Sequence, residues 1–201
     1  MPFDDESRLI ELVAWRSEWD AEFRALAVRL AGCLDERSLA IDHVGSTAVP
    51  GLPAKDVIDV QVRVAALDEA ALTSALASLG FRARPEPWNR HESIGGGELP
   101  KLVFAPPPGD RPANVHVRAA TAPTVRYALL FRDYLRADED AREGWAAFKH
   151  SVQSVTRDLG EYGRIKSAAM PLLMASAERW AAETAWAPSD AGDVEFSPAQ
   201  S

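Results

Sequence analysis

Cysteine is almost absent from this chain of 201 residues, in which Cys33 is the single example. One cysteine cannot form an intramolecular disulfide or supply a cysteine-based zinc site, so both kinds of stabilisation are excluded. Cys33 falls in an apolar helical pattern and is expected to be a small core residue. The fold must therefore be stabilised by side-chain burial, for which the chain is long enough.

Long apolar runs and a basic leader are also missing. No run approaches the ~20 residues that a membrane-spanning helix needs. The first residues, MPFDDESRL, lack the basic and apolar regions of a signal peptide. We therefore expect a cytoplasmic protein that does not associate with a membrane.

Positive charge is in deficit as well. The chain has 22 Lys and Arg against 30 Asp and Glu, for a formal net charge of −8. A broad nucleic-acid-binding surface needs a basic footprint, so nucleic acid is disfavoured as a partner. A local basic pocket for one phosphate group is compatible with this composition, and an anionic, nucleotide-like small molecule is the expected partner.

Strand patterns occupy the first 120 residues. Residues 57–64 (VIDVQVRV) give the clearest strand, because apolar and polar side chains alternate along it. Its apolar face should pack on helices, which leaves Asp59 and Gln61 facing a cleft or solvent. Further strands are predicted at residues 9–13, 39–44, 81–87, 101–105 and 113–118, and the glycine-rich residues 88–99 are expected to form a loop.

Helical spacing is found between these strands and throughout the last third of the chain. Ser17 and Asp68 are the expected N-caps of two helices among the strands. Pro171 should kink or restart the last C-terminal helix. The predicted helices cover residues 19–36, 68–80, 125–137, 141–158 and 162–186.

These elements predict an α+β fold, a mixed sheet flanked by helices with further helices at the C-terminal end. Residues 1–187 are expected to form one domain, whose part from about residue 122 to 187 is helical. Residues 188–201 are polar and are expected to be a disordered tail.

The small residues Gly45, Ser46 and Thr47 follow the predicted strand 39–44. Backbone N–H groups and hydroxyls in such a turn can approach a phosphate, although an ordinary connecting turn has the same composition. The spacing fits neither a P-loop nor a G-x-G-x-x-G fingerprint. His43, directly before this turn, is either a structural brace or a base.

Charged residues follow the turn. A lone carboxylate, Asp59, in a strand beside a phosphate-binding loop suits a metal ligand or a general base. Lys55 could neutralise a phosphate. Lys166 on the last predicted helix could reach back to the same phosphate, or could be a solvated surface lysine.

A third group lies on the strand at residues 113–118. Asn114, His116 and Arg118 share one face of it, so His116 is either a satisfied, partly buried residue or a ligand contact. Lys101 belongs to a local group of basic residues that suits an anionic small molecule, or that forms part of a mixed, solvated surface.

The stretches DHVGSTAVPGLPAKDVIDVQV, RPANVHVR, FRDYLRA and YGRIK together strongly resemble the GrpB family, from about Ile10 to about Met170. This family is grouped with the polymerase-β-like nucleotidyltransferases. The wording GLPAKDVIDVQV…RPANVHVR also resembles the GrpB-like domain that is fused behind dephospho-CoA kinase in actinobacteria. No P-loop of a kinase is present in this chain.

The superfamily resemblance implies a Gly-Ser turn, two carboxylates on the next strand and a third on a later strand, which together bind two metal ions. Gly45 and Ser46 match the turn, and Asp59 matches the first carboxylate. Gln61 stands in place of the second carboxylate, and His116 is the candidate for the third. This set cannot supply the charge for a two-magnesium site. A single Mg²⁺, Mn²⁺ or Zn²⁺ on Asp59 and His116, or a metal-free nucleotide site, would fit better.

Three functions follow as hypotheses, and the residues leave open whether the protein is an enzyme. The first is transfer of a nucleotidyl or phosphate group to a small acceptor, with Asp59 and His116 as catalytic residues. The second is non-catalytic binding of a nucleotide or CoA-type ligand, and the third is an interaction or structural domain. The expected ligand-binding residues are His43, Gly45, Ser46, Thr47, Lys55, Gln61, Lys101, Asn114, Arg118 and Lys166.

Overall fold

The computed structural model describes residues 3–4, 6–94 and 97–194. Its centre is a five-stranded mixed sheet, in which the neighbouring strands β2 and β7 are parallel and the other neighbouring pairs are antiparallel. In spatial order the strands are β1 (Ser38–Val44), β2 (Ile58–Val64), β7 (Ala113–Ala119), β6 (Leu102–Ala105) and β3 (Arg82–Ala83).

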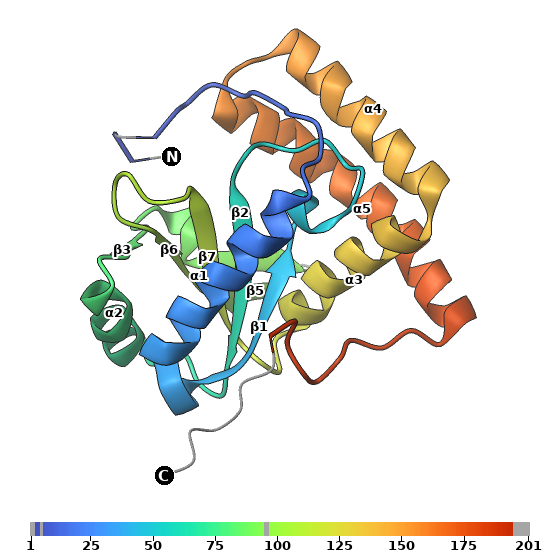
Figure 1. The fold of residues 1–201 in the computed structure, drawn as a ribbon. Coiled ribbons are helices and arrows are strands. Elements are labelled where there is room, and N and C mark those ends of the chain that lie inside the picture. The colour runs from blue at the N-terminus through green and yellow to red at the C-terminus, as the bar shows by residue number, and fades with distance from the viewer. Residues whose placement is uncertain (1–2, 5, 95–96, 195–201) are drawn as a thin grey trace.

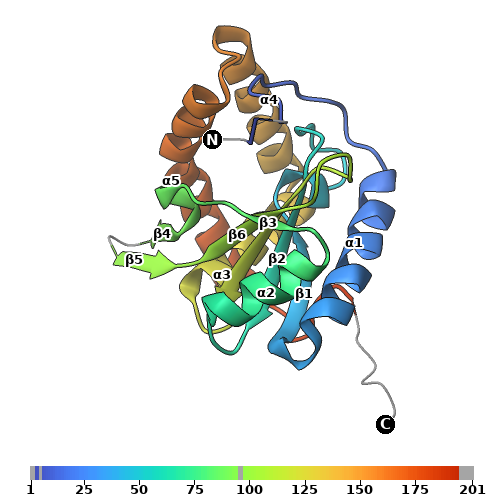
Figure 2. The same ribbon diagram turned by 90° about the vertical axis from the view of Figure 1, so that its left-hand side faces the viewer.

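Helices cover both faces of this sheet (Figure 1). Two of them pack on one face, and three lie beyond the other face, as the turned view shows (Figure 2). The first pair is α1 (Glu18–Leu34) and α2 (Glu69–Ser78); the C-terminal three are α3 (Pro123–Ala137), α4 (Glu139–Val155) and α5 (Leu159–Thr184). The predicted α+β fold with C-terminal helices is confirmed.

Alternation along β2 decides which face is core. Its residues Ile58, Val60 and Val62 are fully buried against α1 and α2, where Trp19 and Phe23 fill the layer. The other face of β2 carries the polar side chains, as the period of two requires. The polar face therefore meets α3, α5 and a hairpin rather than the main core.

The C-terminal helices have a core of their own. Leu130, Tyr134, Trp145 and Met174 from the three helices pack there with Leu52 of the segment between β1 and β2. Because this segment is anchored in the helical core, the loop before β2 is held between the sheet and the helices α4 and α5.

Two sequence predictions about strands are corrected. Residues 9–13 form no strand but an extended strap, paired only at Leu9 with Asp158 and at Val13 with Ala54. The expected loop 88–99 contains a short 3₁₀ turn and the hairpin strands β4 (His91–Ile94) and β5 (Gly97–Pro100). Ile94 pairs with Gly97 at the end of this hairpin, and residues 95–96 lie outside the described part.

The cap and proline predictions have mixed outcomes. Asp68 caps α2 by accepting a hydrogen bond from the N–H of Ala71, as expected. Ser17 occupies the N-cap position of α1, but its side chain makes no capping hydrogen bond. Pro171 lies inside α5, which runs through it as one helix.

The start of the predicted disordered tail is packed on the sheet. Asp193 donates its N–H to the carbonyl of Ile41 and accepts the N–H of His43 on its side chain. A Cβ on Gly192 would lie 2.6 Å from the backbone of Ile41, which shows how closely the segment approaches β1. Residues 186–194 thus cover the edge strand of the sheet, whereas 195–201 lie outside the described residues.

Candidate functional site

The turn after β1 brings backbone directly against the lone carboxylate of β2. Gly45 has φ 73° and ψ −165°, a conformation that is open almost only to glycine. A Cβ at this position would lie 2.5 Å from Asp59 Oδ2. Glycine is therefore required here for two reasons, the positive φ and the lack of room for a Cβ beside Asp59. A short 3₁₀ turn, Ser46–Ala48, follows it.

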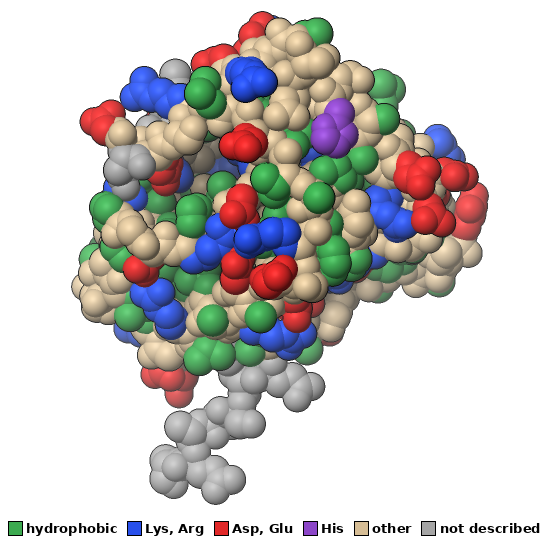
Figure 3. All heavy atoms as spheres, turned by 45° about the horizontal axis from the view of Figure 1, so that its top comes forward, with side chains coloured by type: hydrophobic (Ala, Val, Ile, Leu, Met, Phe, Trp, Pro, Cys, Tyr) green, Lys and Arg blue, Asp and Glu red, His purple; other side chains and the backbone are tan. Residues whose placement is uncertain are grey.

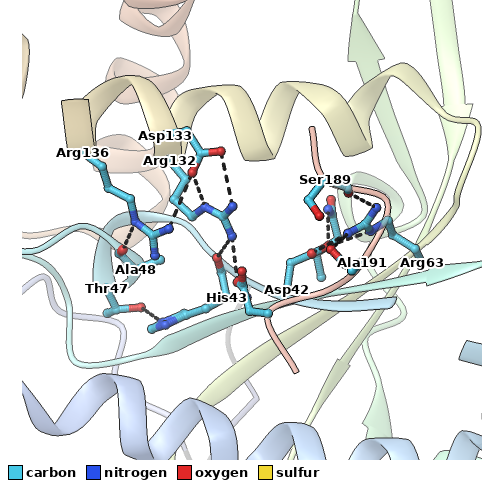
Figure 4. A network of polar contacts seen from close by, with 12 residues as sticks. Asp42, His43, Thr47, Ala48, Arg63, Arg132, Asp133, Arg136, Ser189 and Ala191 are labelled. Atoms are coloured by element: carbon cyan, nitrogen blue, oxygen red, sulfur yellow. Dashed lines mark hydrogen bonds and ion pairs between the residues drawn. The ribbon is translucent and has the colours of Figure 1, made fainter. Parts of the chain in front are cut away.

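Side chains from β1 and α3 fix this turn from behind (Figure 4). The buried ring of His43 stacks on Phe23 at 4.6 Å between centroids, and its Nε2 lies 3.0 Å from Thr47 Oγ1. Arg132 donates to the carbonyl of His43, and Arg136 donates to the carbonyl of Ala48. Burial lowers the pKa of His43 to about 4, so its ring is neutral and acts here as a brace.

Asp59 is poised as an ionised carboxylate. Asn114 on the parallel neighbour β7 donates a 3.0 Å hydrogen bond to its Oδ1, and His116 Nε2 lies 3.7 Å from the same oxygen. Burial alone would raise the pKa of Asp59, but the interactions with His116, Asn114 and Lys55 hold it well below the usual range. Burial, together with the charges of Arg118 and Lys101, lowers the pKa of His116 in spite of its contact with Asp59, so that imidazole is neutral near pH 7.

Three lysines converge on a small cavity beside Asp59. The cavity measures about 40 Å³, room for one phosphate-sized group on a scale of ~10–15 Å³ per water molecule. The whole chain contains only four lysines, against 18 arginines, so their concentration here is not a general surface property. The polar side chains that line it are Ser46, Thr47, Lys55, Asp59, Asn114, Lys149, Tyr162 and Lys166.

The lysines are crowded by one another and by burial. Burial, and then the charge of Lys166, lowers the pKa of Lys55. Lys149 is only 2% exposed; burial and then the charges of Lys166 and Lys55 lower its pKa to about 7. Its Nζ donates to the carbonyl of Pro53. Asp59 is the one carboxylate among the described residues of the lining, so the cavity has an excess of positive charge.

The structure places five of the expected ligand residues outside the cavity lining: His43 and Gly45, which form and brace the turn, and three further residues. Gln61 is fully buried and bridges Asp42 on β1 to Arg118 on β7, so both ends of its amide are occupied. Arg118 also donates to Glu92 of the hairpin, at 2.8 Å from its Nε. Lys101 pairs with the same carboxylate at 3.0 Å. These contacts favour a structural role for Gln61, Arg118 and Lys101 over direct contact with a ligand.

The donors at Asp59 do not fit the metal site that the superfamily resemblance implies. Among the described residues, no group of three or more His, Cys, Asp and Glu is arranged to hold a metal ion. Asp59 already accepts from Asn114, its neighbours are lysines, and Gln61 is held by Asp42 and Arg118. Divalent cations such as Mg²⁺ require several hard oxygen ligands.

Lys149 and Tyr162 belong to the cavity but are not among the sequence-predicted site residues. Both lie on helices whose polar positions look like solvated surface in the sequence. One signal was available: the chain has only four lysines against 18 arginines, and the two side chains are not interchangeable, so each lysine was a candidate for a particular role. Burial raises the pKa of Tyr162 to about 12, so its hydroxyl stays protonated as a donor.

Substitution of Gly45 by alanine tests the approach of turn and carboxylate. We expect Gly45→Ala to lower the free energy of unfolding by ~1–3 kcal/mol, because the new Cβ is strained at positive φ and meets Asp59. Urea denaturation measures this. Gly144→Ala is the matched control: Gly144 lies in α4 with nothing within 4 Å, so alanine there should be neutral or stabilising. Equal effects of the two substitutions would contradict the assignment.

The class defined by this fold and site is an α+β protein built on a five-stranded mixed sheet, with a Gly-Ser turn after one strand and a carboxylate on the next. The chain belongs to the GrpB family, whose sequence model, described as GrpB protein, matches residues 9–175. The sequence resemblance to this family is thereby confirmed.

Three relatives place the chain within the family. It is 36% identical over 197 residues to a dephospho-CoA kinase of Mycolicibacterium paratuberculosis, a match that covers 89% of this chain and 48% of that protein. A UPF0157 protein of Halalkalibacterium halodurans is 31% identical over 169 residues, covering 82% of this chain and 80% of that protein. The crystal structure of the conserved protein GrpB from Enterococcus faecalis superposes with a TM-score of 0.70 and 23% identity, over 85% of this chain and 99% of that one.

The chain spans about half the length of the dephospho-CoA kinases that it matches. The likeness to the solved GrpB structure establishes the fold. Within the described part of the chain, no helix combines the length and the apolar character that crossing a membrane would require.

Proposed function

We propose that this chain binds a phosphate-bearing small molecule of the nucleotide or CoA type, with one phosphate group in the lysine cavity. The observation that carries the proposal is the placement of Lys55, Lys149 and Lys166 around a cavity that is large enough for one such group. Buried like charges are costly, so a fold retains them where a ligand of opposite charge compensates for them.

The remaining lining suits the same ligand. Ser46 and Thr47 offer hydroxyls to phosphate oxygens, and Tyr162 offers a protonated phenol. Asp59 would repel a phosphate on its side of the cavity, so it is better suited to accept a hydrogen bond from a hydroxyl of the ligand. A molecule with a phosphate and a neighbouring hydroxyl, such as a nucleotide, meets both demands.

The outer surface supports a small ligand over a nucleic acid. Figure 3 shows acidic and basic side chains interspersed on one face of the molecule, in place of a continuous basic surface. Together with the net charge of −8, this favours the cavity as a local concentration of positive charge that could recognise phosphate.

A second candidate function is transfer of a nucleotidyl or phosphate group to a small acceptor. The observation that favours it is the ionised Asp59 beside the Gly-Ser turn, where it could accept a hydrogen bond from an acceptor hydroxyl and orient it. The residues around Asp59 do not fit two metal ions. We therefore propose ligand binding as the main function and transfer as the second candidate.

A binding panel tests the first function. Pyrophosphate, ATP and dephospho-CoA are added to the protein with and without Mg²⁺, Mn²⁺ or Zn²⁺; the last probe is suggested by the kinase relatives. We expect pyrophosphate to raise the melting temperature, because a ligand at 100 times its Kd increases the free energy of unfolding by up to ~2.7 kcal/mol. Lys166→Met should weaken this binding about tenfold, because each lysine contributes about 1.4 kcal/mol or more of charge-assisted contact.

The fourth lysine supplies the matched control. Lys101→Met removes the same charge outside the cavity and should leave pyrophosphate affinity unchanged. If no phosphate compound shifts the melting temperature, or if both lysine variants lose affinity equally, the proposal is wrong and an interaction or structural role takes precedence. Release of pyrophosphate from ATP in the presence of an acceptor would instead support the transfer function.

A further inference from the structure

A second, larger hollow adjoins the lysine cavity. It measures about 1070 Å³ and shares Lys55, Val57 and Asn114 with the cavity lining. The N-terminal strap, the loop between β6 and β7 and the first turns of α5 form its walls. We call this hollow the strap groove.

The lysine cavity and the strap groove differ in volume, so they would hold different parts of a ligand. The lysine cavity, at about 40 Å³, holds no more than a phosphate-sized group, so the rest of any nucleotide must lie outside it. The strap groove is of the size that encloses a whole organic ligand, ~300–1,000 Å³ in proteins generally. The shared residues Lys55 and Asn114 mark the passage between the two.

The chemistry of the strap groove suits an aromatic group. Trp88 lines it and is 57% exposed, an unusual position for a large aromatic side chain. Some of the charged groups on its walls form ion pairs: Glu6 pairs with Arg84 at 2.8 Å, and Asp110 pairs at 3.0 Å with Arg29, which lies outside the lining. Apolar side chains such as Val13 and Val103 share the walls with Trp88, so the groove offers a flat, apolar contact.

His116 adds a polar contact at the inner end of the groove. Its ring lines the groove, and its Nδ1 is buried with no hydrogen-bond partner among the described residues. Buried ring nitrogens are normally satisfied, so an orphaned one beside a groove points to a partner supplied by a ligand.

We infer that the strap groove is the subsite for the base of a nucleotide, stacked on Trp88, while its terminal phosphate occupies the lysine cavity. This inference rests on the proposed function, which supplies the phosphate end of the ligand. Stacking on an exposed aromatic ring does not select one base strongly, so purine and pyrimidine nucleotides should both bind.

Three probes separate the two subsites: pyrophosphate, which offers a phosphate group to the cavity but has no sugar or base; ribose 5-phosphate, which lacks a base; and ATP. Calorimetric titration gives each affinity for wild type and Trp88→Ala. We expect Trp88→Ala to weaken ATP about tenfold and to leave pyrophosphate and ribose 5-phosphate unchanged. Trp88→Phe should keep most of the ATP affinity. Leu172→Ala, which trims another exposed apolar side chain away from the groove, should change nothing.

Each outcome decides the inference. Loss of ATP affinity alone in Trp88→Ala supports it. An unchanged ATP affinity, or an equal loss for pyrophosphate and ATP, overturns it while the lysine cavity stands. If wild type binds ATP but not pyrophosphate, the phosphate site of the proposed function fails, and the effect of Trp88→Ala still decides the groove. If wild type binds none of the probes, both proposals are overturned.

Discussion

Replacing Arg63 with leucine is expected to lower the free energy of unfolding by ~3–5 kcal/mol, the cost of leaving one member of a buried ion pair without its partner. Arg63 on β2 is 6% exposed and Asp42 on β1 is 1% exposed. Two hydrogen bonds of 2.9 and 2.7 Å join the guanidinium to both oxygens of that carboxylate.

The same substitution should release the C-terminal segment. Arg63 also donates to the carbonyls of Ser189 and Ala191, which hold that segment on the sheet (Figure 4). Urea denaturation measures the stability, and hydrogen exchange of residues 186–194 measures the release. Arg63→Lys keeps the charge but not the forked geometry, and should lose about half as much stability.

Two variants make the result interpretable. Adding Asp42→Leu to Arg63→Leu removes the stranded carboxylate and should recover part of the lost stability, so the two effects will not be additive. Arg164→Leu changes an exposed arginine on α5 and should stay within ~0.5 kcal/mol of wild type. Additive losses in the double variant would contradict a direct pairing of Arg63 with Asp42.

The local part of the site could be predicted from the sequence, because it lies in 15 consecutive residues. The alternation of β2 placed Asp59 on the polar face, and the small residues of the turn marked a close approach. Gly45 and Asp59 do lie in close contact, since a Cβ on Gly45 would be 2.5 Å from Asp59 Oδ2. Turn chemistry and a strand period of two are enough for that step.

The rest of the site depends on tertiary packing. Lys149 lies 90 residues beyond Asp59, and whether a helical lysine faces solvent or a cavity depends on how α4 packs. Gln61 looked like a ligand replacing a carboxylate, yet its amide bridges Asp42 and Arg118. Period-two patterning finds the face of a strand but not whether polar side chains there satisfy one another.

The structure at the edges of the fold could not be predicted from the sequence for a related reason. The 188–194 segment has a polar composition typical of disorder, but Asp193 meets Arg132 at 2.7 Å and backbone groups of β1. Such pairing with an edge strand leaves no periodic signal in so short a segment. The hairpin at residues 91–100 was hidden by its glycines in the same way, since they mark a turn as readily as a loop.

We expect one substitution in the lysine cavity, Lys149→Met, to make the protein more stable and to weaken its binding of phosphate compounds. Lys149→Met should raise the free energy of unfolding by ~2–3 kcal/mol and the melting temperature by about 4–10 °C, because a 2% exposed ammonium beside Lys55 and Lys166 is replaced by an apolar side chain of similar length. The hydrogen bond to Pro53 is lost, which offsets part of the gain.

The pH dependence of stability gives an independent signature. The folded pKa of Lys149 is about 7, against 10.5 as its ordinary value. Between these values the unfolded chain holds a proton that the folded chain has released, so wild type should become more stable as pH rises from about 7 toward 10. Lys55, Lys166, Asp59 and Tyr162 face the same cavity and remain in the variant. Lys149→Met should flatten the part of the slope that comes from Lys149.

Binding should respond in the opposite direction. Wild-type affinity for pyrophosphate should fall as pH rises above about 7, since Lys149 loses the charge that a phosphate would contact. Lys149→Met should bind pyrophosphate about tenfold or more weakly at pH 6 and less differently at pH 9, whereas Lys101→Met should follow wild type at both. A variant that is both less stable and equally able to bind would show that Lys149 serves the fold. Higher stability with lost affinity would show that the fold carries this buried charge for a ligand.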